Sequence, residues 1–181
     1  MRESRLFDQS QIREVEGAVS LAEELVSNYF KMSSGQWFKS RYDVRTTRNL
    51  ADHERVDGPF AQVVGYEARK KENPFGSSLF NFYRICLQDS AILEAVERRE
   101  GFLLFPFVLY VAVHELIHIV RFTRFEQIYE AAATPGAMME EERKVHGLTL
   151  KILEGVRIDG LAAILDYYGG RSVKSGFDKL V

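Results

Sequence analysis

One stretch decides how the chain folds: Val111-Ala112-Val113-His114-Glu115-Leu116-Ile117-His118-Ile119-Val120. On an α-helix, residues four apart lie one above the other, so His114 and His118 can present two imidazoles to one ion. Glu115 projects about 100° away around the helix, close enough to act on a water at that ion without binding the ion itself. The surrounding apolar residues predict a buried helix that would hold these groups rigidly.

This His-Glu-x-x-His pattern, with its apolar neighbours, resembles the active-site helix of the zincin metallopeptidases. The resemblance covers about ten of the 181 residues. It implies a hydrolase in which His114 and His118 bind Zn²⁺ and Glu115 is the general base. In that chemistry the ion lowers the pKa of its water towards about 7, and Glu115 takes the proton as the water attacks a peptide carbonyl.

The apolar segment from Phe102 to Val120 is almost long enough to span a bilayer. Two histidines and a glutamate near one end of it would be costly in lipid, whereas a bound metal would offset their burial in a protein core. We therefore expect a buried central helix over about 105–125, with Pro106 in its first turn, where the missing N–H costs nothing.

A catalytic zinc site has three protein ligands and an open position for water. The metzincin continuation requires a glycine and a histidine where this chain has Arg121 and Arg124, so that branch is excluded. The gluzincin branch takes a glutamate from a second helix downstream. Such a helix is expected over about 137–154, after the break at Thr134-Pro135-Gly136.

Three residues of this downstream helix are candidates for the third ligand. Glu142 and His146 are four apart and share a face. Either Glu142 binds the metal and His146 contacts substrate or stabilises the oxyanion, or His146 is the ligand and a glutamate is its partner. Gluzincins commonly carry an acidic residue where His146 stands, which leaves both assignments open. We prefer Glu142, with His146 and then Glu141 as alternatives.

Elsewhere the hydrophobic pattern predicts the supporting elements. An amphipathic helix is expected over 8–30, capped by Asp8 or Ser10 and ended by Ser33-Ser34-Gly35. Alternation predicts strands over 60–69 and 80–87 joined as a β-hairpin. The remaining expectations are a turn at 73–76, a helix from Asp89 or Ser90 to about Glu100, a last helix over 155–168, a polar tail over 171–181, an exposed His53, and no assignment for 36–48.

Composition limits the class of protein. A chain of 181 residues with 46% hydrophobic and 28% charged residues predicts one domain with an adequate core. The net charge of −2, mixed in sign along the chain, does not favour a nucleic acid or an anionic membrane as partner. A single cysteine, Cys86, excludes an intramolecular disulfide, and residues 1–5 lack an apolar signal core, so a cytoplasmic location is expected.

These patterns predict a single α+β domain over 1–181, mostly helical, with a β-hairpin or small antiparallel sheet packed on the motif helix as in zincins. The expected function is a gluzincin-like zinc metallopeptidase that cleaves a peptide or protein substrate. One alternative is a di-metal protein using Glu115, His118, Glu142 and His146, although only Glu115 to His118 fits the Glu-x-x-His unit of helix-bundle di-iron sites. Another is an inactive zincin-like domain that binds a partner.

Overall fold

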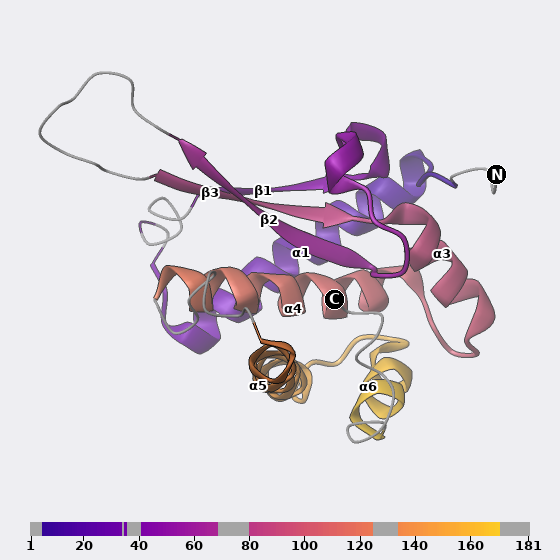
Figure 1. The fold of residues 1–181 in the computed structure, drawn as a ribbon. Coiled ribbons are helices and arrows are strands. Elements are labelled where there is room, and N and C mark those ends of the chain that lie inside the picture. Colours follow the sequence, from indigo (N-terminus) through magenta and orange to yellow (C-terminus); the bar gives the residue numbers. More distant parts are fainter. Residues whose placement is uncertain (1–4, 34, 36–40, 69–79, 125–133, 171–181) are drawn as a thin grey trace, which may run out of the picture.

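The fold is built around one helix. The structure, a computed structural model, describes residues 5–33, 35, 41–68, 80–124 and 134–170. Helix α4 (Leu104–Thr123) lies between a three-stranded sheet on one side and helices α5 (Pro135–Leu153) and α6 (Leu161–Gly170) on the other (Figure 1). Helix α1 (Gln9–Phe30) packs along α4, and α3 (Asp89–Arg98) leads from the sheet into it. The predicted α+β, mostly helical class is confirmed.

Helix α4 is apolar on all sides because every side of it is covered. Its residues from Pro106 to Val120 are buried, the two histidines and the glutamate among them. Within the described residues it is the one helix long and apolar enough to cross a membrane, and 89% of its most apolar window lies inside the protein. Pro106 lies in the first turn, as expected from its missing N–H.

The sheet has the strand order β1-β3-β2, with β1 at Arg41–Thr46, β2 at Ala61–Ala68 and β3 at Phe80–Leu87. Strands β2 and β3 are antiparallel, as the hairpin prediction requires, with Val63 opposite Ile85. The predicted turn at 73–76 lies outside the described residues. Strand β1 runs parallel to β3, with Val44 opposite Ile85. The predicted antiparallel pair is therefore part of a mixed three-stranded sheet, which was not expected because β1 falls in the segment left unassigned.

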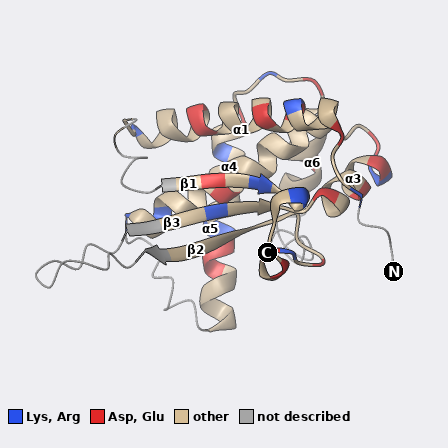
Figure 2. Cartoon of the chain, turned by 90° about the horizontal axis from the view of Figure 1, so that it is seen from above, with Lys and Arg blue, Asp and Glu red and all other residues tan. Residues whose placement is uncertain are grey.

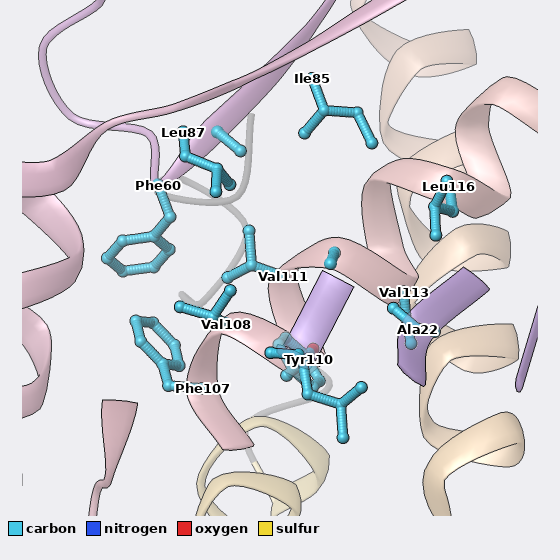
Figure 3. Packing of buried hydrophobic residues seen from close by; sticks show 14 of the residues in the cluster. Ala22, Phe60, Ile85, Leu87, Phe107, Val108, Tyr110, Val111, Val113 and Leu116 are labelled. Atoms are coloured by element: carbon cyan, nitrogen blue, oxygen red, sulfur yellow. The ribbon is translucent and has the colours of Figure 1, made fainter. Parts of the chain in front are cut away.

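The core lies between the sheet and α4. Figure 3 shows Ile85, Leu87 and Phe60 on the sheet side approaching Val108 and Val111 of α4, all buried. On the next face of α4, Ala22 of α1 lies near Val113, and this small side chain lets the two helices pack closely. Each fully buried aliphatic or aromatic side chain contributes about 1.5–3 kcal/mol, so this layer fixes where α4 can lie.

Helix α1 has the predicted extent, but Lys31 rather than the Ser-Ser-Gly segment ends it. The Asp8 carboxylate accepts from the N–H of Gln11, and the Gln11 side chain accepts from the N–H of Asp8. This reciprocal capping satisfies two backbone donors at the helix start. The helix ends at Phe30 because Lys31 takes a left-handed conformation with φ 53°, before the Ser-Ser-Gly segment that was expected to end it.

Two other helix starts differ from expectation. The N-cap of α3 is Gln88, because the Asp89 carboxylate instead accepts from the backbone N–H groups of Phe7 and Thr47. Helix α6 begins at Leu161, although a helix was expected from residue 155. Gly160 has φ +81°, and a Cβ there would meet Leu103 at 3.0 Å, so a glycine lets this turn pass close to the start of α4.

Candidate metal centre

Helices α4 and α5 bring three metal-binding side chains together. Nε2 of His114 lies 3.2 Å from Oε2 of Glu142, and Nε2 of His118 lies 3.0 Å from the other carboxylate oxygen, Oε1. One ligand atom from each residue lies within 4.8 Å of the other two. The carboxylate of Glu142 thus lies between the two imidazoles of the His-Glu-x-x-His pattern.

The antiparallel packing of α4 and α5 produces this arrangement. Tyr110 on α4 faces His146 on α5, and one turn further along α4 His114 faces Glu142, which is one turn earlier in α5. A spacing of four residues on both helices keeps these side chains on the facing sides. Helix α5 starts where the break was expected, with Thr134 as N-cap and Pro135 in the first turn.

Burial and hydrogen bonding shift the pKa values of the cluster in different ways. His114 is fully buried, which lowers its pKa and favours the neutral imidazole that a metal requires. Burial alone would raise the pKa of Glu142, but the hydrogen bonds from His114 and His118 outweigh it and lower that pKa to about 2. The cluster therefore combines a carboxylate that stays ionised with a neutral imidazole.

The donor set fits a divalent transition metal. Donors about 2.1 Å from a tetrahedral Zn²⁺ lie about 3.4 Å from one another, close to the two nitrogen–oxygen distances here. Two imidazoles and one carboxylate leave the fourth position of such an ion to water. Within the described residues the cluster contains no further carboxylate or histidine, so Glu115 and His146 do not extend it to a di-metal site.

One feature departs from well-formed histidine ligands. Nδ1 of His114 is buried and has no hydrogen-bond partner among the described residues. The second nitrogen of a ligating histidine usually donates to a carboxylate, a carbonyl or water. His146, which stands where gluzincins place an acidic residue, is engaged elsewhere: its Nδ1 lies 2.9 Å from the Tyr110 hydroxyl, and its ring also hydrogen-bonds to the backbone of Tyr168.

Glu115 lies beside the cluster. Its side chain is 3% exposed, and burial raises its pKa to about 8. Electrostatic interaction couples it to His118 and Glu142 of the cluster and, more weakly, to Cys86 of β3. No hydrogen bond or ion pair joins its carboxyl to another described residue. The carboxyl therefore has no partner among the described residues, and a cation at the cluster would favour its ionised form, which a general base needs.

The two alternative ligands have other contacts. The Glu141 carboxylate accepts two hydrogen bonds from the guanidinium of Arg121, which fastens the end of α4 to α5. His146 is buried outside the cluster between Tyr110 and Tyr168. The predicted role of His146 towards substrate stays a prediction, and its present contacts are those of a side chain that holds α5 in place.

Sequence reasoning missed the side chains that support the cluster. The ring of Phe122 stacks on His118 with centroids 6.1 Å apart, and on Tyr83 of β3 at 5.9 Å. Tyr110 was also missed. Both Phe122 and Tyr110 lie one turn from a motif histidine, so helical spacing would have marked them as neighbours of the cluster. The contact between Phe122 and Tyr83 joins a helix to a strand that is distant in sequence, so no local spacing predicts it.

Searches against protein-family models, curated proteins and solved structures find no match to this chain. The fold and the cluster define a small, mostly helical α+β protein with a buried His-His-Glu group between two antiparallel helices. Function is therefore argued from the geometry of that group and its neighbours.

Proposed function

We propose that the protein is a zinc-dependent metallopeptidase in which His114, His118 and Glu142 hold Zn²⁺. The single observation that carries the proposal is the Glu142 carboxylate, placed 3.0–3.2 Å from both Nε2 atoms of a His-Glu-x-x-His helix. A buried histidine pair facing an ionised carboxylate is costly as mere core packing and is what a bound cation would offset.

Zinc in this site would acidify a bound water and polarise a carbonyl. Glu115 would take and return a proton in this reaction, because it follows His114 directly, is buried, and has no hydrogen-bond partner among the described residues. Phe122 stacks on His118 and is itself stacked on Tyr83, and these aromatic rings would restrict water on that side of the cluster.

The exposed edge of the sheet favours a peptide as the substrate class. In zincins the exposed edge strand binds extended substrate by adding it to the sheet. Strand β2 is an edge strand here, since it pairs with β3 and with no other described strand. Backbone groups on such an edge recognise any extended peptide, whereas side-chain specificity needs further pockets.

The first test is metal content. Purified protein, reconstituted with zinc and dialysed, should contain about one zinc per chain by elemental analysis. His114→Ala should lose it. Glu115→Gln should keep the zinc, because Glu115 is not a ligand, and should lose hydrolysis of a peptide library. Wild-type protein without zinc would overturn the proposal. Zinc binding with no hydrolysis by the wild type would instead leave a zincin-like binding domain.

A further inference from the structure

A groove of about 530 Å³ lies between α1 and strand β1. Because the strand order is β1-β3-β2, this groove is at the opposite edge of the sheet from β2. Seen from above, α1 runs alongside β1 (Figure 2). No residue of α4 or α5 lines the groove, so it is separate from the candidate metal centre. Its lining residues are Ile12, Val15, Glu16, Val19, Ser20 and Glu23 from α1 with Tyr42, Asp43, Val44, Arg45, Thr46 and Asn49.

Strand β1 presents its backbone edge to this groove. Five consecutive residues of the strand, 42–46, line it. Neighbouring side chains on a strand point to opposite faces of the sheet, so a run of five marks the edge of the strand rather than one face. On its other side β1 pairs with β3, and no second described strand pairs with it. Its outer N–H and C=O groups therefore face the groove.

The chemistry of the groove is apolar and acidic. Ile12 and Val19 of α1 are only partly buried and form its apolar wall. Glu16 is exposed and makes no ion pair or hydrogen bond with another described residue. At the α1–β1 contact the Tyr42 hydroxyl donates to Glu23. Asp43 is ion-paired with Arg45 and with Arg84 of β3, so the remaining negative charge of the groove comes from Glu16 and Glu23.

We propose that this groove binds an extended peptide of a partner protein that adds a strand to β1 and carries, at alternate positions along one of its faces, an apolar, a basic and a second apolar side chain. Backbone hydrogen bonds to β1 would supply affinity, and the helix beside the strand would select side chains, as in other binding by strand addition. The side chains on the peptide face turned towards α1 meet Ile12, Glu16 and Val19, with the apolar ones against Ile12 and Val19 and the basic one against Glu16.

Charge complementarity favours a basic partner over a second copy of this chain. Two copies joined through their β1 edges would bring Glu16 and Glu23 of each close to the same carboxylates of the other. Like charges facing each other across an interface oppose association. A basic peptide removes that repulsion and satisfies Glu16.

The probe is a blocked six-residue peptide, valine-serine-lysine-serine-valine-serine, whose valines and lysine share one face of an extended strand, added to the ¹⁵N-labelled full-length protein. Two control peptides accompany it: the same sequence with glutamate in place of lysine, and the lysine peptide methylated at alternate backbone nitrogens so that it cannot donate along one edge. Amide shifts should concentrate at residues 42–46, and both control peptides should bind at least about tenfold more weakly, a loss of about 1.4 kcal/mol.

A matched pair of variants separates the groove from general charge. Glu16→Lys should weaken binding of the lysine peptide about tenfold. Glu14→Lys makes the same charge change on an exposed part of α1 that does not line the groove, and should weaken it by less than about twofold. Equal binding of the glutamate peptide, full binding of the methylated peptide, shifts along β2 in place of β1, or no binding by any peptide would each overturn the proposal.

Discussion

The hydroxyl of Tyr110 lies 2.9 Å from Nδ1 of His146, which joins α4 to α5 one helical turn from the His114–Glu142 contact. Both residues are buried, and the Tyr110 ring stacks on Tyr168 of α6 with centroids 4.8 Å apart. Three helices therefore meet at this hydrogen bond. Because His146 shares a face with Glu142, the bond limits how far α5 can rotate and so helps to place the Glu142 carboxylate.

Removing this hydroxyl tests that role. Tyr110→Phe leaves Nδ1 of His146 without its partner, which should lower the free energy of unfolding by about 1–3 kcal/mol. Looser placement of Glu142 should also weaken zinc binding about tenfold, measured by competition with a chelator. Tyr29→Phe, at a residue 37% exposed on α1, is the control and should change neither quantity. Unchanged zinc affinity in Tyr110→Phe would mean that this hydrogen bond stabilises the fold but does not help to position Glu142.

Adjacent glutamates on α5 should give opposite results. Glu142→Gln removes the ionised carboxylate between the two histidines, so zinc affinity should fall by at least about a hundredfold. Glu141→Gln disturbs the ion pair with Arg121 and should lower stability while the zinc remains. Elemental analysis and thermal unfolding of both variants, with and without zinc, measure the two effects. Loss of zinc in Glu141→Gln alone would reassign the third ligand.

The sequence predicted the central helix and the helix that faces it because both carry long periodic patterns. The His-Glu-x-x-His spacing also predicted that His114 and His118 share a face, and the search for a downstream glutamate found Glu142, which the structure places against both. The spacing could not choose between Glu141 and Glu142, because neighbouring residues differ by about 100° in direction and only the packing of α5 on α4 decides which one faces the cluster.

The missed elements are those whose pattern is short or whose partners are distant in sequence. Strand β1 has six residues, and its outward positions carry Asp43 and Arg45, which pair with each other and, for Asp43, with Arg84 of β3. Such polar residues weaken the hydrophobic alternation by which a strand is recognised in the sequence, and only the neighbouring strand shows how they are paired. His53 is exposed, as expected, but the next residue, Glu54, is fully buried by contacts that no local pattern indicates.

Glu54 should make stability depend on pH in the acid range. Burial alone would raise its pKa, but hydrogen bonds from Tyr66, the Ala51 N–H and Arg84 lower it to about 2. An unfolded glutamate has a pKa of about 4.3. The ionised carboxylate therefore stabilises the fold fully above that pH, and this contribution is lost as the pH falls towards 2.

The corresponding variant isolates this contribution. Glu54→Gln leaves the Arg84 guanidinium short of a buried partner and should lower the free energy of unfolding by about 3–5 kcal/mol at pH 7. The difference in unfolding free energy between variant and wild type should narrow as the pH falls from 5 to 2. Urea unfolding at each pH measures this difference. Glu97→Gln, which breaks the exposed pair with Arg5, is the control and should change stability far less. A gap independent of pH would show that the carboxylate contributes through packing.

Asp89 should be among the least replaceable polar residues outside the candidate metal centre. It is 1% exposed, and its two carboxylate oxygens accept from the N–H groups of Phe7 and Thr47, joining the N-terminal segment, the end of β1 and the start of α3. Asp89→Asn keeps one acceptor and turns an amide NH₂ towards the other N–H, so unfolding free energy should fall by about 2–3 kcal/mol.

A neighbouring substitution serves as the control for Asp89. Ser90→Ala, one residue along α3, removes a hydroxyl that donates to the Arg5 carbonyl in an exposed contact, so its effect on unfolding should stay below about 0.5 kcal/mol. Hydrogen exchange locates the effect: in Asp89→Asn the amides of Phe7 and Thr47 should exchange faster, because each relies on that carboxylate, while amides in the middle of α4 should keep their order of protection. Equal acceleration throughout α4 would mean that Asp89 supports the whole fold rather than the junction of these three segments.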